Sequence, residues 1–137
     1  MTLPYDPNKV TVTVDGRVIV GLAEGDAIMV APNTDSGQIM VGMQGSAVFS
    51  RSADRSATIT LRLQHNSASH RFLVAKHKAR SDRSFAIVIR DTVSGEGGVG
   101  AACWFLDQPD QTFGAAATTR EWRFAAEAWV PSVPEAV

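Results

Sequence analysis

A glycine-rich run is the first stretch of this chain whose residue types and spacing could support chemistry. GEGGVG at 95–100 fits the G-x-G-x-x-G pattern with which dinucleotide-binding proteins hold a pyrophosphate. The pattern works only where it opens a helix, because the pyrophosphate lies against the helix N-terminus. The residues that follow, ACWFLD, are typical of a strand. We therefore interpret 95–100 as a loop and predict no cofactor-binding residues.

Three histidines and one cysteine are the remaining candidates for metal ligands or a reactive side chain. His70 and His77 are seven residues apart in a segment expected to be helical, so about 10 Å separates them, too far for one zinc ion, even with His65 nearby. We interpret them as surface histidines on a basic helix and predict no metal-binding residues. Cys103 lies in the apolar run 101–106 without a disulfide partner, which favours a buried, unreactive thiol in a reducing compartment.

The sequence contains no recognisable catalytic motif. G-x-S-x-G, H-E-x-x-H, C-x-x-C and Walker patterns do not occur, and no pair of carboxylates stands out. We therefore predict that the protein is not an enzyme and has no catalytic residues.

Length and composition favour a single domain over residues 1–137. The chain is 45% hydrophobic, enough for a substantial core, and has neither an apolar run of the roughly 20 residues that span a bilayer nor a signal peptide, so we expect a soluble intracellular product without a membrane partner. Prolines should keep an N-terminal arm extended over residues 1–9, and we expect residues 131–137 to form a flexible C-terminal tail.

Charge is unevenly distributed along the chain. Residues 51–90 carry nine lysines or arginines against two acids, a balance of +7, whereas the remainder has a balance of −8. This division indicates a basic patch for nucleic acid or complementary surfaces that attract copies of the molecule; ordinary solvated surface charge is the third interpretation.

The stretch 46–78 predicts strand, turn, strand, loop and helix. Ile59, Leu61 and Leu63 alternate with polar residues, the period of a half-buried strand, so one face must be covered. SASHRFLVAKHK at 67–78 changes to a helical period, with Asn66, Ser67 or Ser69 available as N-cap. Further strands are expected on both sides of this unit at 10–14 and 17–22, joined by an Asp15-Gly16 turn, and at 27–31, 85–90, 99–106 and 118–130. The fold class is therefore mainly β: a two-sheet sandwich or barrel of about seven or eight strands with one flanking helix.

The segment 33–45, NTDSGQIMVGMQG, has an apolar centre between glycines and polar residues. It contains Ile39, Met40, Val41 and Met43. As a loop, such a segment needs a partner to cover it. The alternative is an ordinary strand with flanking turns.

A nucleic-acid-binding barrel of the OB type is a second hypothesis, because the middle third is basic and the pattern is rich in strands. Such barrels expose aromatic residues for stacking on bases. The aromatics of this chain lie mostly in runs expected to be core: Phe49, Phe72, Phe85, Trp104, Phe105, Trp122 and Phe124.

The chain resembles the tail tube proteins of contractile-tailed phages from about Tyr5 to Trp129. The resemblance is carried by the opening YDPNKVTVTVDGRVIVGLAEGDAI, the central GSAVFSRSADRSATITLRLQHNSAS, the FAIVIRDT strand, Trp104 and Trp122. It implies two packed β-sheets with a flanking helix, a fold shared with the tube protein of type VI secretion. It further implies a structural virion protein in which six subunits close a ring and rings stack into a conduit for DNA inside a sheath, between baseplate and terminator proteins.

The resemblance also implies which residues form contacts and which do not line the lumen. Ring-to-ring contacts are expected at Ile39, Met40, Val41 and Met43, and on the N-terminal arm at Tyr5 and Pro7. The lumen of such tubes is acidic or neutral and lets DNA pass without specific binding, so the basic stretch 71–83 should face outward. A tube component of a contractile injection system other than a phage would have the same features, and the sequence does not separate the two.

Overall fold

The computed structural model describes residues 10–23, 27–79, 83–93, 95–111, 113–114 and 118–132. These residues form ten strands and one helix. In chain order the elements are β1 (Val10–Val14), β2 (Arg17–Val18), β3 (Ile28–Pro32), β4 (Gly37–Val41), β5 (Ala47–Arg51), β6 (Ala57–Gln64), α1 (Ala68–Lys78), β7 (Phe85–Asp91), β8 (Gly97–Asp107), β9 (Thr119–Ala126) and β10 (Trp129–Ser132).

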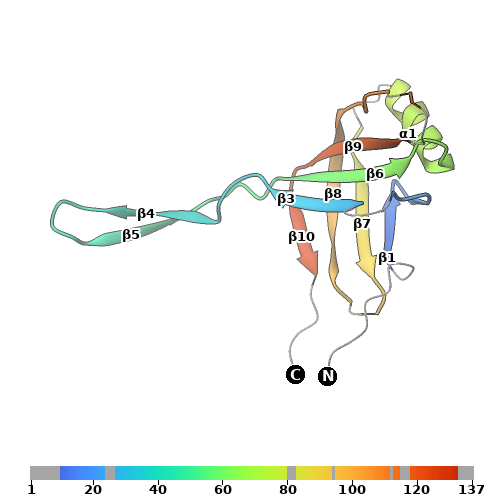
Figure 1. Cartoon of the computed structure of the whole chain (residues 1–137). Coiled ribbons are helices and arrows are strands. Elements are labelled where there is room, and N and C mark those ends of the chain that lie inside the picture. The colour runs from blue at the N-terminus through green and yellow to red at the C-terminus, as the bar shows by residue number, and fades with distance from the viewer. Residues whose placement is uncertain are drawn as a thin grey trace.

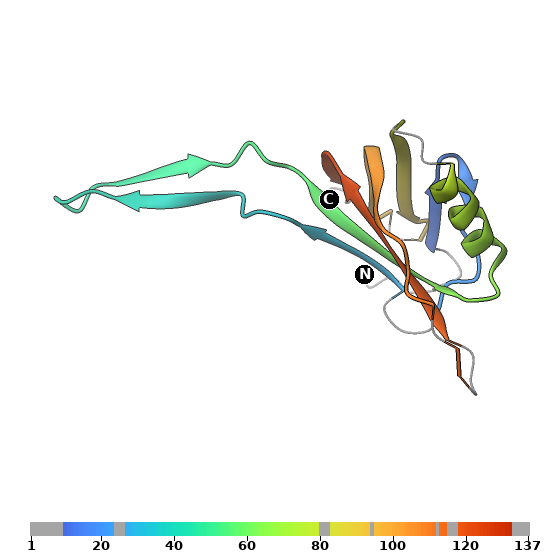
Figure 2. The same cartoon turned by 90° about the horizontal axis from the view of Figure 1, so that it is seen from above.

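Eight strands form one antiparallel sheet in the order β2-β1-β7-β8-β9-β6-β3, with β10 also paired to β8. The sheet curves around its core without closing into a barrel, and β4 and β5 form a separate hairpin that extends away from it (Figures 1 and 2). The expected fold class, mainly β with two sheets and one flanking helix, is confirmed. The layout differs from a sandwich, because the two-stranded sheet does not pack on the face of the larger one.

The alternating patterns predicted from the sequence give the observed core. Ile59, Leu61 and Leu63 of β6 have no exposed surface, and neither do Trp122 and Phe124 of β9. The polar residues between them lie on the opposite, exposed face of the sheet, because successive side chains of a strand alternate between faces. The core therefore fills the concave side of the curved sheet.

Helix α1 covers part of that concave side, as predicted. Ser67 is the N-cap: its Oγ accepts from the backbone N–H of Ser69 (3.1 Å) and donates to the carbonyl of Val20 (2.6 Å). Ser69 Oγ in turn accepts from the N–H of Val20 (2.8 Å). Leu73, fully buried, joins the core. The two serines thus fix the start of the helix to the segment after β2.

Strand pairing differs from the sequence prediction around the centre of the chain. The strand, turn and strand predicted at the start of 46–78 do not form a hairpin. Instead β5 pairs with β4, and β6 pairs with β3. The prediction was wrong because alternation specifies which residues share a face but not which strand lies next to it.

Several strand positions also differ from the prediction. The apolar strand expected inside the sheet at 27–31 is β3, which lies at its edge. β8 begins at Gly97, inside the expected loop, and the last strand is interrupted after Ala126. β10 extends to Ser132, two residues into the expected tail; Pro131 is tolerated there because this part of β10 pairs on one side only.

Candidate functional site

The hairpin formed by β4, β5 and their connecting turn, residues 37–51, is the most exposed apolar element among the described residues; we call it the hairpin arm. It projects from the end of β3 and β6, away from the helix and the core (Figures 1 and 2). Except for Gly37, every residue of the arm is exposed. A two-stranded hairpin has little intrinsic stability in water, so this arm needs a covering surface to hold its shape.

All four apolar residues singled out in the sequence lie on this arm. Their exposed fractions are 67% for Ile39, 61% for Met40, 67% for Val41 and 105% for Met43. Of the two interpretations of 33–45, the loop was wrong and the strand with flanking turns is confirmed, because Gly37–Val41 is a strand. The apolar side chains of this strand still need a partner to cover them, since both faces of the hairpin are exposed.

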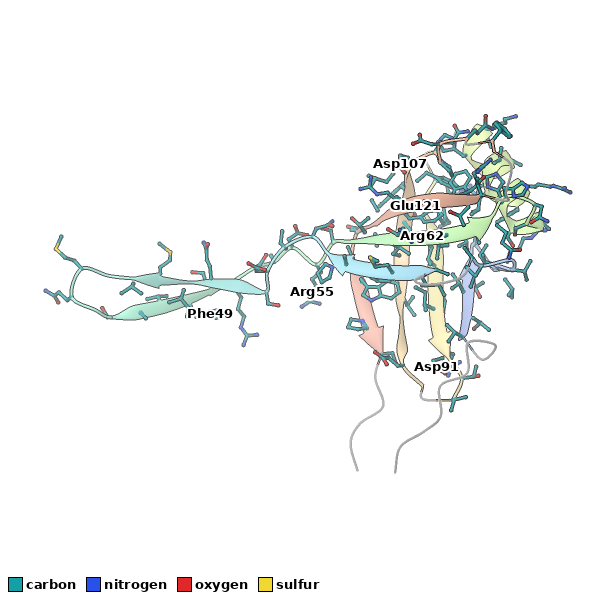
Figure 3. All side chains as sticks on the ribbon, viewed as in Figure 1. Phe49, Arg55, Arg62, Asp91, Asp107 and Glu121 are labelled. Atoms are coloured by element: carbon teal, nitrogen blue, oxygen red, sulfur yellow. The ribbon has the colours of Figure 1, made fainter. Side chains whose placement is uncertain are left out.

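Sequence reasoning missed the second half of this apolar surface, on β5. Val48 is 63% exposed and Phe49, expected in the core, is 56% exposed (Figure 3). The only available signal was that 47–51 matches 37–41 in length and apolar content, as two strands of a hairpin do.

Both faces of the hairpin arm carry apolar side chains. Cross-strand register places Ile39 opposite Phe49 and Val41 opposite Ala47 on one face, which we call the Ile39 face. The other face carries the Met40 and Val48 pair. A hairpin at the surface of a monomer normally turns one polar face to water. The arm therefore has apolar surface to be covered on two sides.

A network of short polar side chains holds the base of the arm. Asn33 Nδ2 donates to Ser56 Oγ (3.0 Å), and Thr58 Oγ1 donates to Asn33 Oδ1 (2.8 Å). Within the segment between β5 and β6 the N–H of Ser56 donates to Asp54 Oδ1 (2.9 Å), and the Ser56 side chain together with this bond lowers the pKa of Asp54. The two connecting segments are thus bonded to each other, which fixes the direction in which the arm leaves the sheet.

The glycine-rich run at 95–100 belongs to a turn and to the start of β8, and opens no helix. A side chain at Gly98 would overlap the Trp129 ring, and one at Gly97 would overlap the carbonyl of Ile89. The glycines therefore let β7 and β10 approach β8 closely on both sides.

His70 and His77 are not simply surface residues, contrary to the sequence prediction. His70 is half-buried, and its Nδ1 accepts a hydrogen bond from Trp122 Nε1 (3.1 Å). The ring of His77 packs edge-on against Phe105, with centroids 5.2 Å apart, and against Trp122. These histidines therefore anchor α1 to the sheet. No group of three potential metal ligands occurs in the described part of the chain.

Acidification should weaken this anchor. Burial, assisted by the charges of Arg120 and His65, lowers the pKa of His70 from its ordinary value of 6.5, and a protonated Nδ1 cannot accept the bond from Trp122. The unfolded chain then binds a proton more readily than the folded one, so stability is complete above pH 6.5 and is lost as pH falls through the lowered pKa. Urea unfolding followed by tryptophan fluorescence, between about pH 7.5 and 5.5, measures this loss.

A matched variant separates His70 from other titrating groups. His70→Gln supplies an amide oxygen as acceptor but does not titrate, so its stability should change less over the same pH range. An identical pH dependence in both proteins would contradict the assignment to His70.

Cys103 is fully buried, as the sequence predicted. Its Sγ donates to the carbonyl of Gly100 (3.3 Å), and burial raises the pKa of the thiol to about 11. At pH 8 only about one thiol in a thousand is then the reactive thiolate. A disulfide reagent should therefore label Cys103 slowly in native buffer and rapidly in urea. Fast labelling of the folded protein would show that the thiol is accessible.

Charges that are segregated in the sequence are brought together in the fold. Lys76 Nζ lies 2.7 Å from Asp15 Oδ2, and Arg62 Nε lies 3.3 Å from Glu121 Oε2. Each pair joins the basic stretch to the acidic remainder of the chain. Arg71 and Lys78 remain exposed on α1. Pairing within one molecule therefore accounts for part of the charge division.

The remaining sequence predictions concern the two ends of the chain, membrane spans and the OB-type alternative. Tyr5 and Pro7 of the N-terminal arm lie outside them, as do residues 133–137. Within them, α1 is too short and too polar to cross a bilayer. The open eight-stranded sheet also differs from the five-stranded barrel of an OB fold, which removes the structural basis of that hypothesis.

Comparison with known proteins gives one family and several similar folds. The family model described as "Bacteriophage PhiTE tail tube protein" matches residues 9–129. No curated protein shows a significant sequence match.

Three solved structures share the fold at low sequence identity. A chain of the PVC extracellular contractile injection system sheath–tube complex in the extended state aligns with a TM-score of 0.68 and 12% identity over 96% of this chain and 93% of that one. The tube-terminating cap of the anti-feeding prophage gives 0.64 and 9% over 98% and 94%. The PVC sheath/tube terminator gives 0.63 and 10% over 95% and 97%.

Proposed function

The chain belongs to the bacteriophage PhiTE tail tube protein family, and from this membership we propose that it is a structural subunit whose copies close into six-membered rings that stack into a tube. The observation that carries the proposal is the hairpin arm: an apolar element, exposed on both faces, that projects away from the core of its own chain. Only another molecule can cover such an element, and copies of the same chain are always present during assembly.

Contacts between rings use the apolar residues of the arm. In this proposal Ile39, Met40, Val41 and Met43 are covered by the next ring, and Tyr5 and Pro7 of the N-terminal arm add to the contact. The arm suits this role because its base is held by hydrogen bonds and its direction is fixed. Because its direction is fixed at the base, the arm loses less conformational entropy on binding than an arm on flexible connections would.

The assembled tube would conduct DNA during ejection. In this proposal it lies inside a sheath and ends at baseplate and terminator proteins, and the protein is made in the host cytoplasm and remains in the virion tail. DNA passes through the lumen without specific binding, and the chain acts on no substrate and uses no cofactor.

A tube component of a contractile injection system is a second candidate. The fold likeness to chains from the PVC and anti-feeding prophage particles favours it. The contacts between subunits would be the same in a phage tail and in an injection system, so the neighbouring genes distinguish the two. Capsid and terminase genes indicate a phage, and their absence indicates an injection system.

Negative-stain electron microscopy of the purified protein tests the proposal. Rings or tubes with a central hole are the expected result. A monodisperse monomer at high concentration, without hollow assemblies under any condition, would overturn it.

A further inference from the structure

Solvent-exposed methionines mark the hairpin arm. Of the four methionines in the chain, three lie among the described residues, and none of those three is buried. Their exposed fractions are 105% for Met43, 61% for Met40 and 47% for Met29. Met40 and Met43 belong to the arm, whereas Met29 lies on β3, in the body of the molecule. Since methionine is among the residues most often buried, this exposure leaves thioether sulfurs open to reagents in solution.

The turn at the tip of the arm presents Met43 to solvent. The N–H of Gly45 donates to the carbonyl of Gly42 (3.0 Å), and the N–H of Gly42 donates to the carbonyl of Ser46 (2.7 Å). These bonds close a tight turn over 42–45 in which Met43 is the second residue. At full exposure, no neighbouring side chain shields its sulfur. A small oxidant therefore reaches this thioether as easily as in an unfolded chain.

Met40 lies on the strand that leads into this turn. Cross-strand register places it opposite Val48, on the face of the arm that also carries Gln38 and Ser50. Val48 is itself 63% exposed, so the pair covers only part of the Met40 side chain. The two sulfurs of the arm thus differ in shielding, but neither is enclosed.

We propose that Met40 and Met43 are sites of oxidation by hydrogen peroxide and related hydroperoxides, and that their sulfoxides keep a subunit out of the tube. In the reaction a sulfur lone pair attacks one oxygen of hydrogen peroxide, so that an S–O bond forms as the O–O bond breaks. The sulfur gives two electrons to the peroxide, and the second oxygen leaves as water with both protons. The effect on assembly rests on the proposed function, whereas the chemical step does not.

A sulfoxide makes the apolar arm polar. Oxidation converts a flexible apolar side chain into a polar, chiral one that accepts hydrogen bonds. Any surface that covers the arm must then bury this acceptor, and burying a polar group without a donor costs about tenfold or more in affinity. The fold itself should be unaffected, because neither methionine belongs to the core. Oxidation therefore acts on assembly and not on folding.

The other described sulfur groups do not share this role. Cys103 is fully buried, and burial raises the pKa of its thiol to about 11, so little of it is the thiolate that peroxides oxidise. Met29 lies opposite Thr60 of β6, and its sulfoxide leaves the arm unchanged. Methionine sulfoxide is also reversible, because two reductases, one for each epimer, return it to the thioether. Assembly should therefore follow the oxidation state of the arm alone.

Oxidation of the unassembled protein locates the reactive residues. Hydrogen peroxide is added in native buffer and in urea, and tandem mass spectrometry assigns each added oxygen to a residue. Met43 should react equally fast in both conditions, and Met40 within about threefold of its rate in urea, because susceptibility follows exposure. Protection of either residue by about tenfold or more in the native protein would overturn the assignment.

Matched leucine variants connect the modification to assembly. Met40→Leu with Met43→Leu removes both sulfurs of the arm and keeps Met29, whereas Met29→Leu does the reverse; leucine preserves the apolar volume. After peroxide treatment and removal of the peroxide by catalase, the critical concentration for tube formation should rise about tenfold or more in the wild type and in Met29→Leu. It should stay unchanged in the double variant. Loss of assembly only after oxidation of the double variant, or unchanged assembly of the fully oxidised wild type, would overturn the inference.

Enzymatic reduction gives a second measurement on the wild-type chain. Treatment of the oxidised protein with both methionine sulfoxide reductases should restore assembly as the added oxygen is removed. Sulfoxide removal without recovery of assembly would contradict the inference.

The outcomes separate this inference from the proposed function. Failure of the untreated wild type to form rings or tubes refutes the proposed function, while mass spectrometry still decides whether the arm methionines are the oxidation sites. Untreated tubes that form equally well from oxidised protein refute only the effect of oxidation on assembly.

Discussion

Replacing Ile39 and Met40 with aspartate is expected to abolish tube formation while leaving a folded monomer. The two side chains lie on opposite faces of the hairpin arm, so each face gains a carboxylate. Burying an unpaired charge against apolar surface costs at least a factor of ten in affinity, and two such charges should raise the critical concentration about a hundredfold. Electron microscopy and sedimentation measure the loss of tubes.

The fold should survive because neither residue belongs to the core. Circular dichroism and urea unfolding should match the wild type. Gln38→Glu with Ser52→Asp is the control, since it adds the same charge to the arm and its base at positions that are already polar. Tubes from the Ile39→Asp, Met40→Asp protein would show that the arm is not the contact.

Of the variants described here, Trp122→Ala should cause the largest loss of folding stability. Its side chain is fully buried, contacts Phe105 and both anchoring histidines, and donates to His70. Trp122→Ala removes the ring and leaves a cavity, at a cost of about 3–5 kcal/mol. The free energy of unfolding of a domain is about 5–15 kcal/mol, so this loss is a large fraction of the total. Thermal and urea unfolding measure it.

Two further variants show where the effect comes from. Trp104→Ala removes a tryptophan that is 38% exposed, and its cost should be about 1 kcal/mol. Trp122→Phe retains an aromatic ring but not the hydrogen bond to His70, and should lie between the two. Equal losses of unfolding free energy in Trp104→Ala and Trp122→Ala would contradict the larger contribution assigned to Trp122.

Local patterns predicted much of the architecture. The alternation around Ile59, Leu61 and Leu63 identified the buried face of β6, and the change of period after it identified α1 with Ser67 among its possible caps. These features depend on neighbours within a few residues, where the geometry of a strand or helix turn decides which side chains share a face. On the hairpin arm, the apolar residues of 39–43 were identified because they are neighbours in the sequence, whereas Val48 and Phe49 of the partner strand were missed.

The joint between sheet and arm was not predicted. Asn33, Asp54 and Ser56 are residues that favour turns, so their segments were interpreted as loops. In the structure Asn33 and Ser56 bond to each other across the two connecting segments and direct the arm outward. Since the partners are more than 20 positions apart, no local pattern reveals the pairing.

The sequence by itself determined which residues are apolar, which of them alternate, and where turns and the helix cap lie. Only the tertiary structure decided that β4 pairs with β5, that Arg62 meets Glu121, and that Trp122 donates to His70. The physical reason is that strand pairing, ion pairing and hydrogen bonds between side chains depend on residues distant in the chain, whose approach is set by the packing of the whole sheet.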